Sequence, residues 1–273
     1  MNATFYKYLV RHPLLRGYIK FFWELTIDKA ELNHKIIPQR NINLRFNLND
    51  TPHYAVINGK ESKLEEVNFS GLQDKYMNAS LKMNGQVHVF GICFYPEGLF
   101  PFFNIPVSEF KNQIWGAKQI GVRLMNEICE LLKEAHDIRT RLNIIETEFA
   151  KLLVNGNVPP ANFRQIFKAF HDNPNPAQIS RLCNKNNLTI RSLERMFNKY
   201  VGVSASTYYT LNRFHVSTNQ LLYTDFRKFS DLAFDNGYFD QMHFIRDFKR
   251  FTGNTPKNFV SQQNSILQIG NYT

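Results

Sequence analysis

The side chains best suited to chemistry in this chain are basic and amide groups on short helical stretches near its C-terminal end. In GYFDQMHFIRDFKRFTGNTP, residues 237–256, the apolar residues Phe244, Phe248 and Phe251 fall at i, i+4 and i+7, which predicts a helix with one apolar stripe. Gln, Met, His, Arg and Lys occupy the rest of its surface. Because Arg pairs with guanine and Gln with adenine in the DNA major groove, we interpret that surface as a candidate DNA-reading face.

This stretch is the second copy of an internal repeat, which predicts two similar structural units. The matching positions, 51 residues apart, are Arg195 and Arg246, Phe197 and Phe248, Tyr200 and Phe251, Gly202 and Gly253, Ser204 and Thr255, and Tyr208 and Phe259. Each copy predicts a short helix, a tight turn and a longer helix, with Thr189 and Asp240 capping the longer helices. Asn187 and Gly237 suit a left-handed turn. Such a helix-turn-helix fits its second helix into a major groove.

The repeat lies in the more basic part of the chain. Residues 161–273 carry 14 Lys and Arg against 7 Asp and Glu, whereas residues 1–160 carry 19 against 16. The whole chain has a formal net charge of +10. A basic second half favours a polyanionic partner, nucleic acid before membrane. The positive charge is equally consistent with a simpler role, which is to keep the protein soluble.

Residues 1–118 predict mainly β-structure. In NINLRFNL, residues 41–48, Ile, Leu and Phe alternate strictly with Asn and Arg, which is typical of a strand buried on one face. Residues 17–25 and 86–95 are also aromatic and β-branched, and the second is apolar on both faces, which predicts a central strand. Short strands at this spacing favour a small barrel or sandwich.

Helical spacing of apolar residues begins after Gly121. Two helices within residues 121–154, the second capped by Asp137, are expected to close the first domain. NGNVPP, residues 155–160, has the composition of a linker. Whether the helical pair also joins two chains is left open by the sequence.

The fold class expected from these patterns is α+β, in two domains. Residues 1–156 are expected to form a β-barrel or sandwich with closing helices. Residues 161–273 are expected to form an all-α domain with two helix-turn-helix units, joined by a helix from about Ser204 to Tyr223.

The repeat resembles the DNA-binding domain of the AraC-type transcription regulators of bacteria. The resemblance covers about residues 161–260 and rests on the second-unit signature GYFDQMHFIRDFKR, residues 237–250, followed by GNTP, residues 253–256. It implies two helix-turn-helix units joined by a long helix. The sequence departs from the family pattern at Phe239, where a small capping residue is usual, at Met242, where Ser is common, and at Ala205, where the first unit often has Pro.

The resemblance assigns base contacts to the exposed early positions of each recognition helix. The base-reading candidates are therefore Arg191, Glu194, Arg195, Gln241, Met242, His243 and Arg246. The phosphate-contacting candidates are Thr189, Lys199, Lys249 and Arg250. Structural alternatives stay open, because the two equivalent arginines could form ion pairs instead. An exposed Glu is usually only solvated, and a Met at this position could pack under the next helix.

The N-terminal part resembles the cupin-like sensor half of one subgroup of these regulators. The matching segments are Tyr18 to Glu24, the strand 36–48 and FYPEGLFPFFNIPVSEF, residues 94–110. The resemblance implies a regulatory domain that responds to a small-molecule or protein effector. Candidate lining residues for the effector site are Phe21, Trp23, Phe46 and Phe90.

A metal-dependent enzyme is the main alternative for this domain, because cupin barrels often hold metal. A metal-binding barrel needs a His-x-His pair and a carboxylate on adjacent strands, whereas His34, His53 and His88 are isolated in the sequence. No G-x-S-x-G, P-loop or dinucleotide fingerprint occurs. We therefore expect no metal, no cofactor and no catalytic residues.

The expected function is that of a sequence-specific transcription regulator that reads two adjacent major-groove segments and is controlled through its N-terminal domain. Its expected partner is double-stranded DNA, with RNA polymerase and a second copy of the chain as further candidates. A non-DNA-binding interaction module is the remaining alternative. No apolar run approaches the roughly 18 residues of a membrane span, and no signal-peptide pattern is present. We expect a cytoplasmic protein without membrane contact.

Overall fold

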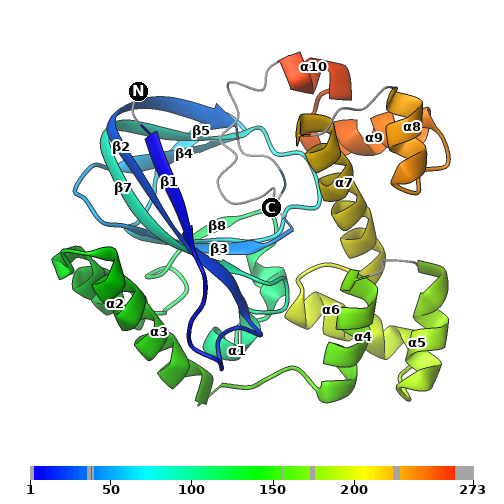
Figure 1. Cartoon of the computed structure of the whole chain (residues 1–273), viewed down its shortest axis with the longest axis horizontal. Coiled ribbons are helices and arrows are strands. Elements are labelled where there is room, and N and C mark those ends of the chain that lie inside the picture. Colours follow the sequence, from blue (N-terminus) through cyan, green and yellow to red (C-terminus); the bar gives the residue numbers. More distant parts are fainter. Residues whose placement is uncertain are drawn as a thin grey trace.

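The computed structural model has a strand-rich N-terminal domain and a helical C-terminal region (Figure 1), and it describes residues 3–35, 38, 40–154, 156–172, 176–223 and 228–261. The strands are β1 (Ala3–Tyr8), β2 (Ile19–Lys35), β3 (Ile42–Asn47), β4 (His53–Ile57), β5 (Lys60–Lys63), β6 (Val67–Ser70), β7 (Ala79–Phe94) and β8 (Ile114–Gly116). The N-terminal helical elements are α1 (Phe100–Phe103), the 3-10 helix η1 (Val107–Phe110), α2 (Leu124–Glu134) and α3 (Ile138–Val154).

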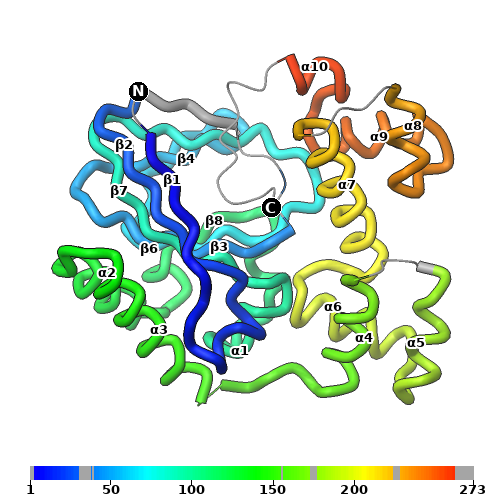
Figure 2. The backbone as a smooth tube through the Cα atoms, in the orientation of Figure 1, coloured from blue at the N-terminus to red at the C-terminus, as the bar shows by residue number. Residues whose placement is uncertain are grey.

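The C-terminal elements are α4 (Ala161–Asp172), the 3-10 helix η2 (Pro176–Gln178), α5 (Ile179–Lys185), α6 (Ile190–Tyr200), α7 (Ala205–Tyr223), α8 (Phe229–Asp235), α9 (Gln241–Thr252) and α10 (Pro256–Ser261). Figure 2 follows the chain from α3 into α4. Among the described residues, none of the helices is both long and apolar enough to cross a membrane.

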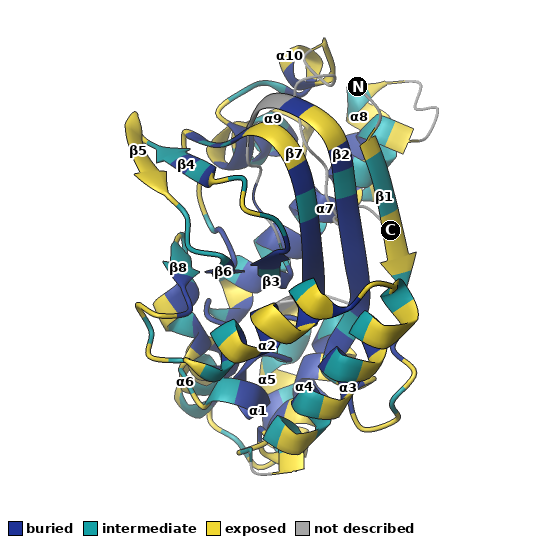
Figure 3. Cartoon of the chain, turned by 90° about the vertical axis from the view of Figure 1, so that its left-hand side faces the viewer, coloured by how far each residue is buried: buried dark blue, intermediate teal, exposed yellow. Residues whose placement is uncertain are grey.

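The N-terminal domain is built on one antiparallel sheet with β7 at its centre. The strand order is β1-β2-β7-β3-β6-β8, and β4 pairs with both β5 and β7. Strand β7 pairs with β2 along its length on one side and with β3 and then β4 on the other. From Val89 to Phe94 both faces of the strand are mostly buried (Figure 3), and the strand order places β7 inside the sheet, so the prediction of a central strand is confirmed.

The sheet has two buried faces with different partners. One apolar cluster holds Trp23, Leu25 and Met83, and it also packs against Phe5 of β1 and Ile114 of β8, the two ends of the strand order. The sheet must therefore curve around this cluster, which we call the inner cluster. The opposite face carries residues such as Phe46 and Phe90 and packs against the helices.

Strand β3 is buried on both faces, which differs from the expectation of a half-buried strand. Its apolar residues face the helices, and its polar residues Asn43 and Asn47 are only 6% and 8% exposed. The alternation along the strand is as expected. The polar side is covered because the sheet curves over it, and alternation alone carries no information about that curvature.

The C-terminal region contains the two expected helix-turn-helix units, α5–α6 and α8–α9. The turn residues Asn187 and Gly237 have φ of 53° and 70°, the left-handed conformation that a sharp corner requires. Helix α7 connects the units, with α4 to α6 near one of its ends and α8 to α10 near the other (Figure 1). The N-terminal domain lies along one side of α7 and of both helix groups.

Gly91 of β7 provides a test of the inner cluster. A Cβ added at Gly91 would lie 2.0 Å from the Trp23 ring, and this buried ring has little room to move. We expect Gly91→Ala to lower the free energy of unfolding by about 1–3 kcal/mol through overpacking, measured by urea denaturation. Gly17→Ala is the control, because nothing lies within 4 Å of its added Cβ. Equal stability of the two variants would contradict the packing described for Trp23.

Candidate nucleic-acid interface

Helix α6 presents a basic surface because its apolar residues are used on the opposite side. Leu193, Phe197 and Tyr200 are buried, and the Thr189 hydroxyl accepts a hydrogen bond from the Ser192 N–H at 3.1 Å. That bond satisfies one of the free N–H groups at the helix start. The capping role expected for Thr189 is confirmed.

Helix α9 repeats this arrangement. Phe244, Phe248 and Phe251 are buried, which confirms the apolar stripe. The Asp240 carboxylate accepts a hydrogen bond from the His243 N–H at 2.6 Å and caps the helix, as expected from the sequence. Gly253 ends the helix with φ of 71°.

Five of the seven base-reading candidates are available for contact. Their side chains are exposed and have no hydrogen bond or ion pair with any described residue: Arg191, Arg195, Gln241, Met242 and Arg246. Gln241 and Met242 lie in the first turn of α9, and the N-terminal residues of a recognition helix are the ones that contact base edges.

The other two candidates have structural partners. Glu194 accepts a hydrogen bond from the Ala205 N–H at 3.2 Å, at the start of α7. His243 lies 3.1 Å from the Arg213 guanidinium, which also forms a 2.6 Å ion pair with Asp247. Both side chains therefore help to fix the recognition helices against α7. The sequence pattern places them on the outer side of their helices and does not indicate this role.

The phosphate candidates also differ from one another. Lys249 is exposed, whereas the Lys199 ammonium lies 4.9 Å from the centroid of the Phe100 ring in the N-terminal domain. The Arg250 guanidinium donates to the Asp74 carbonyl at 3.3 Å, and the Arg250 carbonyl accepts from the Tyr76 N–H at 2.8 Å. Two of the four basic or polar candidates thus contact the N-terminal domain.

Phe239 is a surface residue that sequence reasoning did not place in the site. Its side chain is 92% exposed, just before the cap of α9. A large apolar residue at such exposure, three positions before the 61% exposed Met242, adds accessible apolar surface at this helix start. The signal was present in the sequence as a departure from the family pattern.

The domain junction contains a contact to the connecting helix. Arg40 of the N-terminal domain donates a hydrogen bond to the Asn212 side chain in α7. Nearby, burial raises the pKa of the Tyr208 hydroxyl, and the charge of Glu97 adds to that rise. Glu97 therefore faces this junction. Burial raises the pKa of its own carboxyl group to about 7.

The effector candidates divide between the two faces of the sheet. Phe21 and Trp23 lie in the inner cluster, and Trp23 borders a pocket there. Phe46 and Phe90 are fully buried against the helices on the opposite face. They cannot line the same pocket, because alternate residues of a strand point to opposite faces.

The isolated histidines have separate environments. His88 lies 2.9 Å from the Glu24 carboxylate, to which Arg141 also donates at 2.9 Å. His53 borders the inner pocket, and the side chain of His34 lies outside the described residues.

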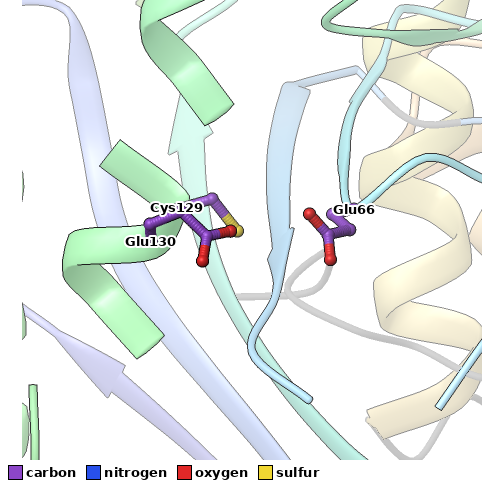
Figure 4. A group of neighbouring side chains, drawn as sticks. All are labelled: Glu66, Cys129 and Glu130. Atoms are coloured by element: carbon purple, nitrogen blue, oxygen red, sulfur yellow. The ribbon is translucent and has the colours of Figure 1, made fainter. Parts of the chain in front are cut away.

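Within the described part of the chain, one group of side chains has the spacing of metal ligands: Glu66, Cys129 and Glu130 (Figure 4). The ammonium of Lys133 already bridges this group, at 2.8 Å from Glu66 and 3.0 Å from Glu130. Burial raises the pKa of the Cys129 thiol to about 12, so the thiolate that binds metals is disfavoured. The cluster is accounted for as a salt-bridge network.

Comparison with known families decides the nature of the helical region. Residues 11–115 match a domain of unknown function (DUF6597), and residues 182–262 match a family described as a helix-turn-helix domain. The second match spans both units found in the structure. The C-terminal domain is a helix-turn-helix domain of the AraC type. This AraC-type domain is of a kind found in DNA-binding transcription regulators.

Solved structures show similar arrangements at low sequence identity. ToxT from Vibrio cholerae O395 is 10% identical over 90% of this chain and 99% of its own, with a TM-score of 0.47. The C-terminal domain of AraT, a response regulator from Geobacillus stearothermophilus, is 18% identical over 40% of this chain and 89% of its own, with a TM-score of 0.34. Neither likeness bears on what this chain binds. No curated protein matches the sequence.

Glu97 makes the stability of the junction depend on pH. Its folded-state pKa of about 7 lies above the ordinary value of 4.5. Below pH 4.5 both states are protonated; as pH rises to 7 the unfolded state loses its proton first, so stability falls across this window. We expect Glu97→Gln to raise the free energy of unfolding by about 2–3 kcal/mol at pH 8 and not at pH 4.

The measurement is urea denaturation at both pH values. The control is Glu134→Gln, at an exposed position at the end of α2, which should change stability little at either pH. The same gain for Glu97→Gln at pH 4 and pH 8 would contradict a raised pKa of the Glu97 carboxyl group.

Proposed function

We propose that this chain is a sequence-specific transcription regulator that reads two adjacent major-groove segments and is controlled through its N-terminal domain. The observation that carries the proposal is the pair of equivalent arginines, Arg195 of α6 and Arg246 of α9. Both are exposed and unpaired among the described residues. Both project from second helices of helix-turn-helix units, the helices that enter the groove in this motif.

The connecting helix supports contact with two groove segments. Helix α7 spans 19 residues, which corresponds to about 28 Å at 1.5 Å per residue. Successive major-groove segments on one face of DNA lie about 34 Å apart. The widths of the flanking helices, with some bending of the DNA, cover the remaining distance.

The proposed roles of individual residues follow from their surroundings. Base edges are contacted by the five exposed candidates, Arg191, Arg195, Gln241, Met242 and Arg246. Thr189 and Lys249 contact phosphates, with Lys199 and Arg250 joining them once released from the N-terminal domain. Glu194 and His243, which are bonded within the helical region, position the recognition helices.

The contacts of the N-terminal domain suggest how it controls DNA binding. Phe100 packs edge-on against Tyr200 at 4.9 Å between ring centroids and lies under Lys199, while Asp74 and Tyr76 hold Arg250. Both cations are exposed, but each must leave its contact with the N-terminal domain to extend fully toward a phosphate. We infer that the described arrangement is one of low DNA affinity and that separation of the domains raises it.

The two arginines should determine different parts of the binding site. Arg195→Ala and Arg246→Ala should each relax base preference in a different half, at a cost of about 1–3 kcal/mol if the contact is bidentate to guanine. Lys249→Ala is the matched control; it should weaken all sequences alike and lower the salt slope by about one unit. Selection of each full-length variant on a randomised duplex pool measures both effects. Loss of preference at the same base pairs, or at none, would sink the two-segment proposal.

Weakening the contact with α9 should increase DNA affinity. The Tyr76 ring is 40% exposed and packs beside Gly253, so Tyr76→Ala loosens the contact near Arg250 at small cost to the fold. Because loss of this ring weakens the contact that holds α9 against the N-terminal domain, we expect affinity for all duplexes to rise about two- to tenfold, measured by fluorescence anisotropy. Tyr6→Ala, at an exposed position in β1, is the control. Unchanged or weaker binding by Tyr76→Ala would exclude this form of control.

A further inference from the structure

The inner face of the sheet contains a pocket that the proposed DNA contacts do not use. The pocket is partly open to solvent, and its empty volume of about 410 Å³ includes that open part. One part of the wall is apolar, formed by Trp23, Leu25, Leu81, Met83 and Val89. The other part is polar and includes Arg45, Asn47 and His53.

The shape of the apolar wall depends on Gly91. Trp23, Gly91 and Arg45 lie side by side in one row across β2, β7 and β3. Because Gly91 has no side chain, the Trp23 ring lies directly over it, within 2.0 Å of where a Cβ would stand. The Trp23 indole N–H donates to the Asn43 side chain at 3.3 Å. The ring is therefore fixed as a flat wall next to the guanidinium of Arg45.

Arg45 is a half-buried residue whose guanidinium has no counter-ion among the described residues. Its Nε and Nη2 atoms are buried and make no hydrogen bond to any described residue. Glu66 also borders the pocket, but its carboxylate is bonded to Lys133. Burial lowers the pKa of Arg45 to about 10, so the group is still protonated at neutral pH. A buried, unpaired charge is costly, and an anion in the pocket would offset that cost.

The remaining polar atoms limit the charge of that anion to one. Burial, with a smaller contribution from Arg45, lowers the pKa of His53 to about 4, which leaves its ring neutral. Its Nε2 atom and the Asn47 Oδ1 atom have no partner among the described residues. A dianion such as phosphate would leave a net negative charge in a largely apolar pocket, whereas a carboxylate matches Arg45 in charge and in its planar two-oxygen geometry.

We propose that this pocket binds a small organic acid, with its carboxylate on the Arg45 guanidinium and a compact apolar body against Trp23, Leu81 and Met83. His53 and Asn47 accept or donate hydrogen bonds to polar groups on that body. The proposal names organic acids as the ligand class of the N-terminal domain. A role for the bound acid in controlling DNA binding rests on the proposed function, whereas acid binding itself does not involve DNA.

The test is titration calorimetry of the full chain without DNA. The probes are sodium benzoate and sodium hexanoate, the neutral counterparts benzamide and hexanamide, and inorganic phosphate. At least one acid should bind at millimolar concentration or below, about 10- to 100-fold more tightly than its amide, because hydrogen bonds to a charged group are stronger than neutral ones. Failure of both acids to bind, equal binding of acid and amide, or preference for phosphate would overturn the proposal.

Variants of Arg45 assign the binding to this pocket. Arg45→Met should lose about 10- to 100-fold in acid affinity and should melt no lower than the wild type, because it removes an unpaired buried charge. Arg139→Met, an exposed arginine of α3, is the matched control and should bind the acid normally. Arg45→Lys, which keeps the charge but not the two-pronged geometry, should bind at an intermediate level and serves if Arg45→Met does not fold. Acid binding that is unchanged in both Arg45 variants would place the ligand elsewhere.

The two proposals can fail separately. Acid binding that depends on Arg45, together with no sequence-specific DNA binding, would leave the ligand site standing and remove the proposed function. DNA recognition that depends on Arg195 and Arg246, together with no acid binding, would do the reverse.

Discussion

The arrangement of the two domains depends on the packing of Phe100 against Tyr200. Both side chains are buried, with their rings edge to face, and they join the outer face of the sheet to the core of the first helix-turn-helix unit in one apolar cluster. Gly202 is required beside them, since a Cβ there would lie 2.9 Å from the Val107 carbonyl. Close-packed contacts of this kind either hold or separate; they do not deform gradually.

Helix α7 links this contact to the rest of the proposed DNA-binding surface. The N-terminal domain contacts the end of α6 through Phe100, the middle of α7 through Arg40, and the end of α9 through Tyr76. These three contacts set the separation and orientation of both recognition helices relative to the sheet. The same sheet encloses the Arg45 pocket on its other face, so a change in the curvature of the sheet has a physical path to the contacts.

The parts of the structure that sequence could predict are those determined locally. The turns at Asn187 and Gly237 follow from the repeat and from the conformations that these residues tolerate, and so do the caps and the apolar stripes. The curvature of the sheet determines which of its faces borders a pocket, and the sequence carries no signal for that curvature. The sequence therefore predicts Phe46 at the effector site, whereas its side chain packs against the helices. Contacts between domains, such as Lys199 over the Phe100 ring, join residues far apart in the sequence and leave no periodic signal.

The two repeats, although equivalent in sequence, are held by the N-terminal domain in different ways. The first is held through a buried aromatic pair, whereas the second is held through backbone hydrogen bonds beside Tyr76, a residue that is 40% exposed. Local opening costs least where few apolar groups are buried. The second unit is therefore expected to detach before the first. Under the proposed function, α9 would then reach the duplex while α6 is still held.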